Sequence, residues 1–216
     1  MQNHFGKVQE WCVRVSNSTK FYRRCYTIAY PIFCTLFRIK IFGRENINEG
    51  AAMICANHSS MFDPVFIGLA LGKNDQPLYI AKAELFNIPV LAWLLRGLGA
   101  TGVDRTKADI SIVKKSLSKL KAGAKVVIFP EGTRVAEDGD NSVKHGAIKI
   151  AERADAYILP VYIPRKKPIF SKVRIVIGKP YKIIKQKTKR TYDDYELLSN
   201  ELMSKIQKLK DFATTL

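Results

Sequence analysis

The chain alternates between short apolar runs and segments of helical periodicity after residue 50, and this alternation constrains the fold more than any other feature. Runs typical of strands lie at residues 51–56, 78–82, 125–129, 157–163 and 173–177. Helical patterns lie at residues 64–71, 88–95, 107–121, 145–153 and 191–212. Strands that alternate with helices are typical of an α/β fold. We therefore predict a mostly parallel central sheet flanked by helices for residues 45–216.

The first 44 residues have a different character. Their longest uncharged run, residues 25–37, is thirteen residues long, which is shorter than the roughly 20 residues that a membrane-spanning helix needs. Aromatic residues in and before this run are spaced so that they share one face of a helix. These residues are Tyr22, Tyr26, Tyr30, Phe33 and Phe37.

Two interpretations of this aromatic face are open. Aromatic side chains flanked by Arg23, Arg24 and Arg38 suit the headgroup boundary of a bilayer. Alternatively, the face packs against the protein's own core. The basic flanks favour the membrane, so we expect residues 1–44 to form an amphipathic interfacial helical segment, kinked or broken at Pro31.

The net charge of +17 is concentrated in two segments. Residues 1–44 contain eight Lys and Arg against one acid, and residues 165–190 contain eleven against none, so the rest of the chain is close to neutral. Such patches attract polyanions, either nucleic acid or an anionic membrane, and charge alone does not separate the two.

The four cysteines lack metal-type spacing and are interpreted as reduced packing residues, which favours a cytoplasmic location. No cleavable signal peptide is evident at the amino terminus.

The sequence NHSSMFD at residues 57–63 combines a base with a carboxylate. His58 and Asp63 would lie about 140° apart on a continuous helix, so they meet only if the chain leaves a strand, turns through Ser59 and Ser60, and then enters a helix. The pair would then stand at a strand's carboxyl end, where the carboxylate orients the histidine as a general base. The alternatives are a polar loop histidine and an aspartate that caps the helix before Pro64.

The sequence FPEGTR at residues 129–134 follows a buried apolar strand. Pro130 and Gly132 favour a tight turn that presents Glu131 and Arg134. Arg105 ends a Gly-rich turn, and arginine suits bidentate binding of phosphate. The alternatives are solvated charges on an exposed turn and, for Arg105, an ordinary surface residue.

Together these blocks resemble the bacterial 1-acyl-glycerol-3-phosphate O-acyltransferase family, the PlsC-like glycerolipid acyltransferases. Residues 57–63 resemble the family's NHxxxxD block, and residues 99–105 resemble its Gly-rich block ending in arginine. Residues 129–134 match its FPEGTR block letter for letter, and residues 159–161 resemble its short fourth block. The resemblance covers about residues 40–180, and Gly102 departs from it because the family usually has a bulky apolar residue there.

The resemblance implies an enzyme that moves a fatty acyl group from an acyl thioester to the sn-2 hydroxyl of lysophosphatidic acid, which yields phosphatidic acid. His58 would take the hydroxyl proton, and Asp63 would orient the histidine and balance its charge. Amides near Gly132 and Thr133 are candidates to stabilise the oxyanion. The expected substrate-binding residues are Asn57, Lys82, Arg105, Glu131, Gly132, Thr133 and Arg134.

The resemblance also implies the partners and the location. We expect no metal and no bound cofactor, with acyl carrier protein or coenzyme A carrying the thioester. Residues 165–190 could face that carrier. A peripheral or monotopic enzyme of phospholipid biosynthesis, at the cytoplasmic face of the cell membrane, would contact anionic lipids rather than nucleic acid. The alternatives are an acyltransferase of the same family that uses another lysolipid, such as a lyso-ornithine lipid, and a non-catalytic basic membrane-binding protein.

Overall fold

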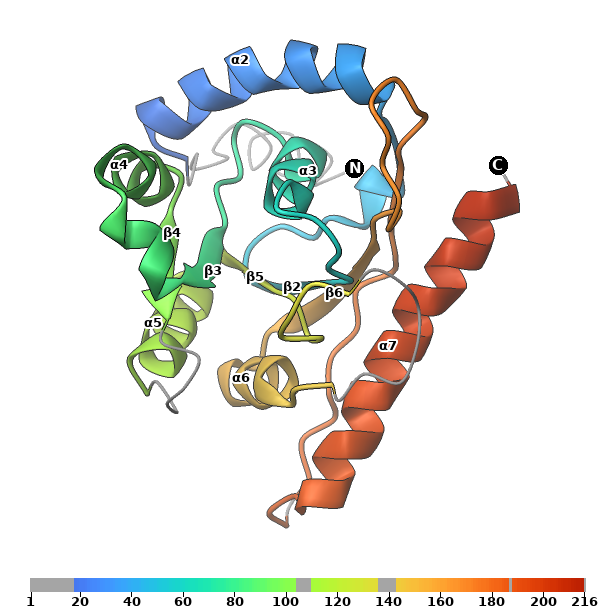
Figure 1. The fold of residues 1–216 in the computed structure, drawn as a ribbon. Helices are drawn as coiled ribbons and strands as arrows, with labels where there is room; N and C mark the ends of the chain where they lie inside the picture. Colours follow the sequence, from blue (N-terminus) through green and yellow to red (C-terminus); the bar gives the residue numbers. More distant parts are fainter. Residues whose placement is uncertain (1–17, 104–109, 136–142, 187, 216) are drawn as a thin grey trace, which may run out of the picture.

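A seven-stranded sheet forms the centre of the computed structural model, which describes residues 18–103, 110–135, 143–186 and 188–215 (Figure 1). The strand order is β1-β7-β6-β2-β5-β3-β4. The strands are β1 (Lys40–Phe42), β2 (Ala52–Ala56), β3 (Leu78–Lys82), β4 (Ala100–Val103), β5 (Lys125–Ile128), β6 (Tyr157–Tyr162) and β7 (Arg174–Ile177). All neighbouring pairs are parallel except β6 with β7, so the predicted mostly parallel sheet is confirmed.

The central strand β2 explains why its sequence is uniformly apolar. It pairs with β5 on one side and with β6 on the other, with Ile54 opposite Val127 and Leu159. Every residue of β2 is buried. A strand covered by helices on both faces of a parallel sheet has no polar face, which accounts for the continuous apolar run.

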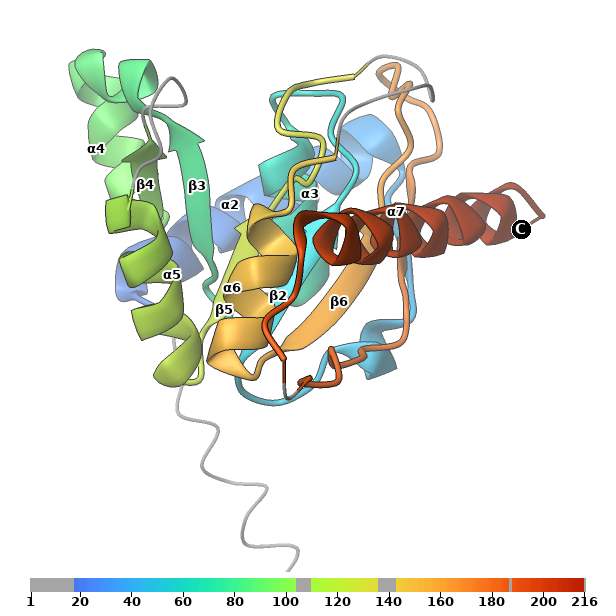
Figure 2. The same ribbon diagram turned by 90° about the horizontal axis from the view of Figure 1, so that it is seen from below.

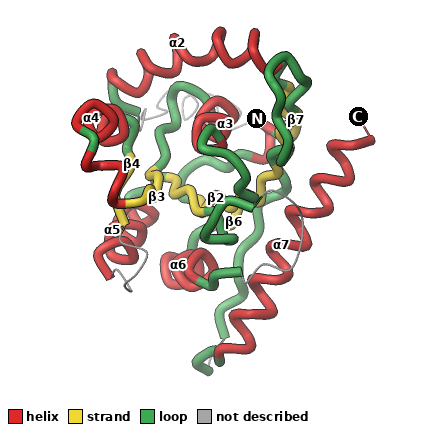
Figure 3. The backbone as a smooth tube through the Cα atoms, viewed as in Figure 1, coloured by secondary structure: helices red, strands yellow, loops and turns green. Residues whose placement is uncertain are grey.

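Three helices cover one face of the sheet (Figures 1 and 3). They are α5 (Ile110–Lys121), α6 (Gly146–Ala154) and α7 (Tyr192–Thr215). Their apolar side chains join those of the strands in one core cluster, which includes Met53, Leu120, Ile148, Ile158 and Leu202. This packing confirms the helices expected at residues 145–153 and 191–212, and the one expected at residues 107–121 from residue 110 onward, since residues 107–109 lie outside the described part of the chain.

The opposite face is covered by α2 (Lys20–Phe37) and α3 (Asp63–Leu71). A second core cluster joins them to the sheet and includes Phe37, Ile54, Phe66, Ile67 and Val127. The helix α4 (Pro89–Gly97) and two 3-10 turns, η2 (Arg44–Asn46) and η3 (Ala83–Asn87), complete the described elements. Both faces of the sheet are therefore covered.

Two strands lie where the sequence did not predict them. Residues 100–103 were assigned to a Gly-rich turn but form β4, which pairs with β3. Here the Phe86 ring lies 3.1 Å from where a Cβ at Gly102 would stand, so the ring occupies the space of a bulkier residue. Residues 40–42 form β1 and pair with β7, so the sheet begins before the domain boundary expected at residue 45.

The aromatic face of α2 packs against α3. Tyr22 is only 4% exposed and donates from Oη to the Gly68 carbonyl at 3.4 Å, and Tyr26 reaches the Leu69 carbonyl at the same distance. The ring centroids of Phe33 and Phe37 lie 5.6 and 5.3 Å from that of Phe66. The prediction that Tyr22 and Phe37 contact a membrane is therefore wrong, because an aromatic face suits a protein core as well as a bilayer.

The helix α2 is not broken at Pro31, where the sequence predicted a kink or a break, and runs on to Phe37. Proline removes one backbone hydrogen bond. The helix is held on both sides of that position, by Tyr22 and Tyr26 before it and by Phe33 and Phe37 after it. These tertiary contacts thus offset the free energy lost with the backbone hydrogen bond at Pro31. None of the described helices combines the length and the apolar character needed to cross a bilayer.

Candidate active site

Three loops converge at one edge of the sheet (Figure 2). They follow β2, β5 and β6, which are parallel neighbours, so their carboxyl ends meet at the same edge. This edge is where α/β folds place ligands. It brings together residues 57–63, residues 129–135 and residues 163–167 from distant parts of the sequence.

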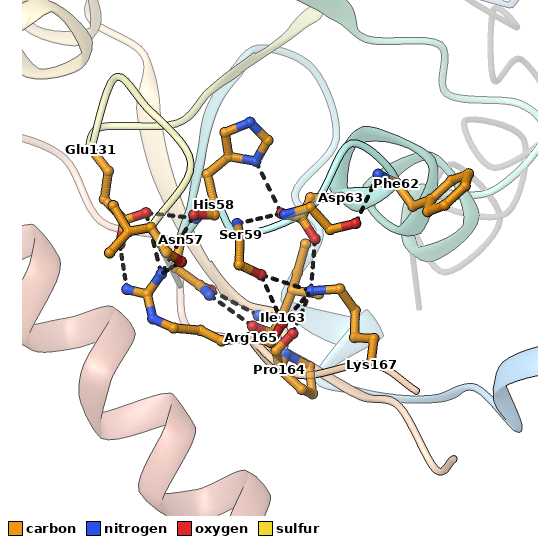
Figure 4. Close-up of polar contacts among 12 residues, drawn as sticks. Asn57, His58, Ser59, Phe62, Asp63, Glu131, Ile163, Pro164, Arg165 and Lys167 are labelled. Atoms are coloured by element: carbon orange, nitrogen blue, oxygen red, sulfur yellow. Dashed lines mark hydrogen bonds and ion pairs between the residues drawn. The ribbon is translucent and has the colours of Figure 1, made fainter. Parts of the chain in front are cut away.

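His58 and Asp63 contact each other across the first loop (Figure 4). The Nδ1 atom of His58 lies 2.9 Å from Oδ2 of Asp63. The backbone amides of Ser59 and Ser60 each donate to the same oxygen at 2.7 Å, so the turn between strand and helix folds around the carboxylate. The N-cap of α3 is Phe62, so Asp63 is not the helix cap that the alternative required.

The His58 residue is fixed from three other directions. Its backbone N–H donates to Oε2 of Glu131 at 2.8 Å, and its carbonyl accepts from Val135 N–H at 2.8 Å. Its ring stacks on Phe129, with the centroids 4.1 Å apart. Because Nδ1 is hydrogen-bonded to the carboxylate, Nε2 is the ring nitrogen that can exchange a proton with a substrate.

Lys167 is a site residue that the sequence analysis missed. Its Nζ lies 3.0 Å from Oδ1 of Asp63 and donates to Ser59 Oγ at 2.8 Å. The side chain is only 4% exposed. The lysine therefore holds the second carboxylate oxygen while His58 holds the first.

Arg165 is a second residue that the sequence analysis missed. Its guanidinium forms a bidentate ion pair with Glu131 and also donates to the Val135 carbonyl at 2.9 Å. Both residues belong to the basic run 165–190, which the sequence analysis expected to face a polyanion or the acyl carrier rather than buried carboxylates. The only available signal was their position a few residues after the fourth block, at the end of β6.

The environment of Asp63 favours its ionised form. Burial alone would raise the pKa of this carboxyl. The hydrogen bond to His58, the charge of Lys167 and the amides of Ser59 and Ser60 outweigh that effect and lower the pKa below its ordinary value. For Lys167, burial lowers the pKa, and the attraction of Asp63 partly opposes this.

Three residues expected to bind substrate have other partners in the structure. Asn57 is buried, and its side chain donates to the Ile163 carbonyl at 2.7 Å and accepts from the Ile163 amide at 2.9 Å. Glu131 is buried between His58 and Arg165. The Gly132 amide donates to the Phe129 carbonyl at 3.0 Å. The side chains of Asn57 and Glu131 therefore hold the loops of the site together. That these residues and Gly132 contact the substrate stays a prediction.

The remaining predicted residues lie outside this network. Thr133 and Arg134 are exposed on the loop after β5. Lys82 is exposed at the end of β3 and pairs with Glu84 at 2.9 Å. Arg105 lies outside the described residues. Within the described ranges, no three His, Cys, Asp or Glu side chains gather as a metal site would require.

The fold and this site define the class of protein. The model of the family called Acyltransferase matches residues 38–164, which span the sheet from β1 to the loop after β6 and include the residues from His58 to Glu131. The chain belongs to this family.

Within this family, the chain is similar in sequence to enzymes of known activity. Over 165 residues the chain is 30% identical to the 1-acyl-sn-glycerol-3-phosphate acyltransferase of Bacillus subtilis, an alignment covering 74% of this chain and 81% of that protein. It is 29% identical over 196 residues to a chloroplastic 1-acyl-sn-glycerol-3-phosphate acyltransferase of Arabidopsis thaliana. That alignment covers 84% of this chain and 51% of the plant protein, so the chain spans about half the length of this relative.

A solved structure shares the fold. The crystal structure of the 1-acyl-sn-glycerophosphate (LPA) acyltransferase PlsC from Thermotoga maritima superposes with a TM-score of 0.64 at 24% sequence identity. The superposition covers 98% of this chain and 84% of that one.

Proposed function

We propose that this chain transfers a fatty acyl group from an acyl thioester to the sn-2 hydroxyl of 1-acyl-glycerol-3-phosphate. The observation that carries the proposal is the contact of 2.9 Å between Nδ1 of the partly exposed His58 and Oδ2 of the buried Asp63. The substrate class comes from the relatives, which are 1-acyl-sn-glycerol-3-phosphate acyltransferases. The product would be phosphatidic acid, a precursor of phospholipids.

The proton transfer follows from the orientation of His58. Ionised Asp63 accepts a hydrogen bond from Nδ1–H, so Nε2 has a lone pair that can take the proton of the substrate hydroxyl. The hydroxyl oxygen attacks the thioester carbonyl and forms a tetrahedral oxyanion. When this intermediate collapses, the carbon–sulfur bond breaks, and the imidazolium returns the proton to the thiolate.

Asp63 must stay charged for this cycle to run. As His58 becomes an imidazolium, the carboxylate balances the new charge and keeps the ring in its tautomer. Lys167 and the two amides favour the ionised carboxylate in the buried site. The network around Asp63 thus sets the protonation state that the base requires.

Exposed cations near the sheet edge that carries the candidate active site would bind the phosphate of the acceptor. Arg165 and Lys167 are committed to carboxylates, so Arg134, on the loop after β5, is the described arginine best suited to the acceptor's phosphate. Arg105 and Lys82 remain further candidates, and Thr133 can donate a hydroxyl hydrogen bond beside Arg134. Acyl carrier protein or coenzyme A would deliver the acyl group, without a metal or other cofactor.

The location follows from the acceptor. A lysophosphatidic acid with a long acyl chain resides in a bilayer, so the enzyme would act as a peripheral protein at the cytoplasmic face of the membrane. The net charge of +17 suits anionic lipids.

Mass spectrometry of the product tests the reaction. Purified protein is incubated with lysophosphatidic acid in anionic vesicles and with an acyl thioester of either carrier protein or coenzyme A. We expect phosphatidic acid from the wild type and about 10²- to 10⁴-fold less, the range of a general-base contribution, from His58→Ala.

Two outcomes would redirect the proposal. Equal product from His58→Ala would overturn the mechanism. No product with lysophosphatidic acid, but product with another lysolipid, would keep the acyl transfer and change the acceptor. Failure with every acceptor would favour a non-catalytic membrane-binding protein.

A further inference from the structure

Four large apolar side chains are exposed beside the candidate active site. Met61 and Phe62 lie between His58 and Asp63 in the sequence and are 63% and 52% exposed. Ile169 and Phe170 follow Lys167 and are 62% and 61% exposed. We call these four residues the apolar rim. Clustered apolar exposure of this kind marks a surface that contacts a partner.

The two halves of the rim belong to loops that are tied together. Ser59 donates from Oγ to the Arg165 carbonyl at 3.0 Å and accepts from Lys167 at 2.8 Å. Both halves also contact the carboxyl-terminal part of α2, where the Phe33 ring lies 5.9 Å from the Phe62 ring and the Leu36 carbonyl accepts from Phe170 N–H. Figure 4 shows the Phe62 ring directed away from His58. The rim therefore borders the site without filling it.

Phe170 is held in an unfavourable backbone conformation. Its φ of +66° lies in the left-handed region, which bulky side chains rarely adopt. The Arg38 guanidinium donates twice to its carbonyl, with Nε at 3.0 Å. Such strain persists only where neighbouring groups impose it, and it concentrates at functional positions. Here it presents an exposed phenyl ring to solvent.

Exposed cationic side chains lie near the rim residues along the chain. Lys166 and Lys172 flank Ile169 and Phe170 in the loop, and Arg38 and Lys40 follow α2, with all four exposed. No acid occurs in residues 165–190. Exposed apolar side chains accompanied by positive charge match a bilayer with anionic headgroups, whose phosphates pair with the cations while the acyl region accepts the side chains.

We propose that the apolar rim is the surface through which this protein docks on an anionic lipid bilayer, with Ile169 and Phe170 inserting beside the active site. The proposal rests on the proposed function and adds its docking geometry. The aromatic face of α2 packs on α3. The membrane contact that the sequence analysis expected of that face is therefore made by the rim instead. A lipid acceptor could then reach His58 from the bilayer over a short path.

A vesicle assay with a matched control tests the rim. The variant Ile169→Ser/Phe170→Asn removes both side chains without changing the charge, and asparagine tolerates a positive φ. The control Ile184→Ser/Leu197→Asn removes two side chains that are 85% and 70% exposed, one of them in the same basic run. Flotation is measured with vesicles of phosphatidylcholine and phosphatidylglycerol and with phosphatidylcholine alone.

We expect the rim variant to bind the anionic vesicles about tenfold or more weakly than the wild type, since the loss of one buried apolar side chain has an effect of that order. The control should bind like the wild type. Turnover of a short-chain lysophosphatidic acid, which is monomeric in solution, should not change in the rim variant. Turnover of a vesicle-bound acceptor should fall.

Two results would overturn the proposal. One is undiminished flotation of the rim variant. The other is an equal loss of turnover with soluble and vesicle-bound acceptors, which would make the rim part of the substrate site. If the wild type acylates no acceptor but the rim variant still loses vesicle binding, the proposed function fails while the docking surface stands.

Discussion

Lys167 and Asp63 form a buried ion pair in which Nζ lies 3.0 Å from Oδ1, with the side chains 4% and 0% exposed. The residues are separated by 104 positions, and each follows the carboxyl end of one of the neighbouring parallel strands β2 and β6. A buried carboxylate without a cation nearby would favour its neutral form. The pair therefore links the geometry of the loop after β6 to the charge state of the residue that orients His58.

Replacing Lys167 with methionine should shift the pH dependence of catalysis. Without the lysine charge, burial raises the pKa of Asp63, so the carboxyl becomes protonated at a higher pH. Because the ionised form is the active one, the acid limb of the kcat/KM profile should move to higher pH, with a larger loss at low pH than at high pH. The measurement is a pH profile with a soluble short-chain acceptor.

The control for this shift is Lys179→Met, which removes an exposed lysine from the same basic run. Its profile should match that of the wild type. A uniform loss of activity at all pH values in Lys167→Met would show that the lysine only supports the fold.

Asp63→Asn should lower kcat by about 10²- to 10⁴-fold, the range seen when a histidine base loses its carboxylate partner. The asparagine amide would donate toward Nδ1, so the proton would move to Nε2 and the ring could no longer accept the substrate proton. Steady-state kinetics and a thermal unfolding curve on the same sample separate this effect from unfolding. A kcat within threefold of the wild type, on the order of experimental scatter, would contradict the orienting role.

Glu131→Gln should destabilise the protein by about 3–5 kcal/mol, because it leaves the largely buried Arg165 cation without its carboxylate. The double variant Glu131→Gln/Arg165→Met should cost less than the sum of the two single variants. Urea unfolding of the four proteins measures this coupling. Additive costs would mean that the two side chains do not stabilise each other.

Arg134→Ala should raise the apparent KM for lysophosphatidic acid by about 10- to 100-fold, the equivalent of one charge-assisted hydrogen bond, with little change in kcat. Arg153→Ala removes an exposed arginine from α6 and serves as the control. An acceptor that lacks the phosphate should show no difference between Arg134→Ala and the wild type. An unchanged KM would assign the phosphate to other cations.

Residues close in sequence were predicted with the best success. The turn that joins His58 to Asp63 spans five residues, so its geometry follows from a strand that ends at Ala56 and a helix that starts with Pro64 in its first turn. Glu131 was also located correctly, at the end of β5. Its contacts with His58 and Arg165 were not predicted, because these partners lie 73 and 34 residues away in the sequence.

The sequence by itself determined the alternation of strands and helices, since that pattern depends on which faces of each element are apolar. It also determined the block that places a histidine beside a carboxylate, because both residues belong to one turn. Only the tertiary structure decided that α2 turns its aromatic face to α3, that residues 40–42 join the sheet, and that Lys167 reaches Asp63. An amphipathic face or a basic run has the same local pattern against a core, a membrane or water, and only long-range packing selects among them.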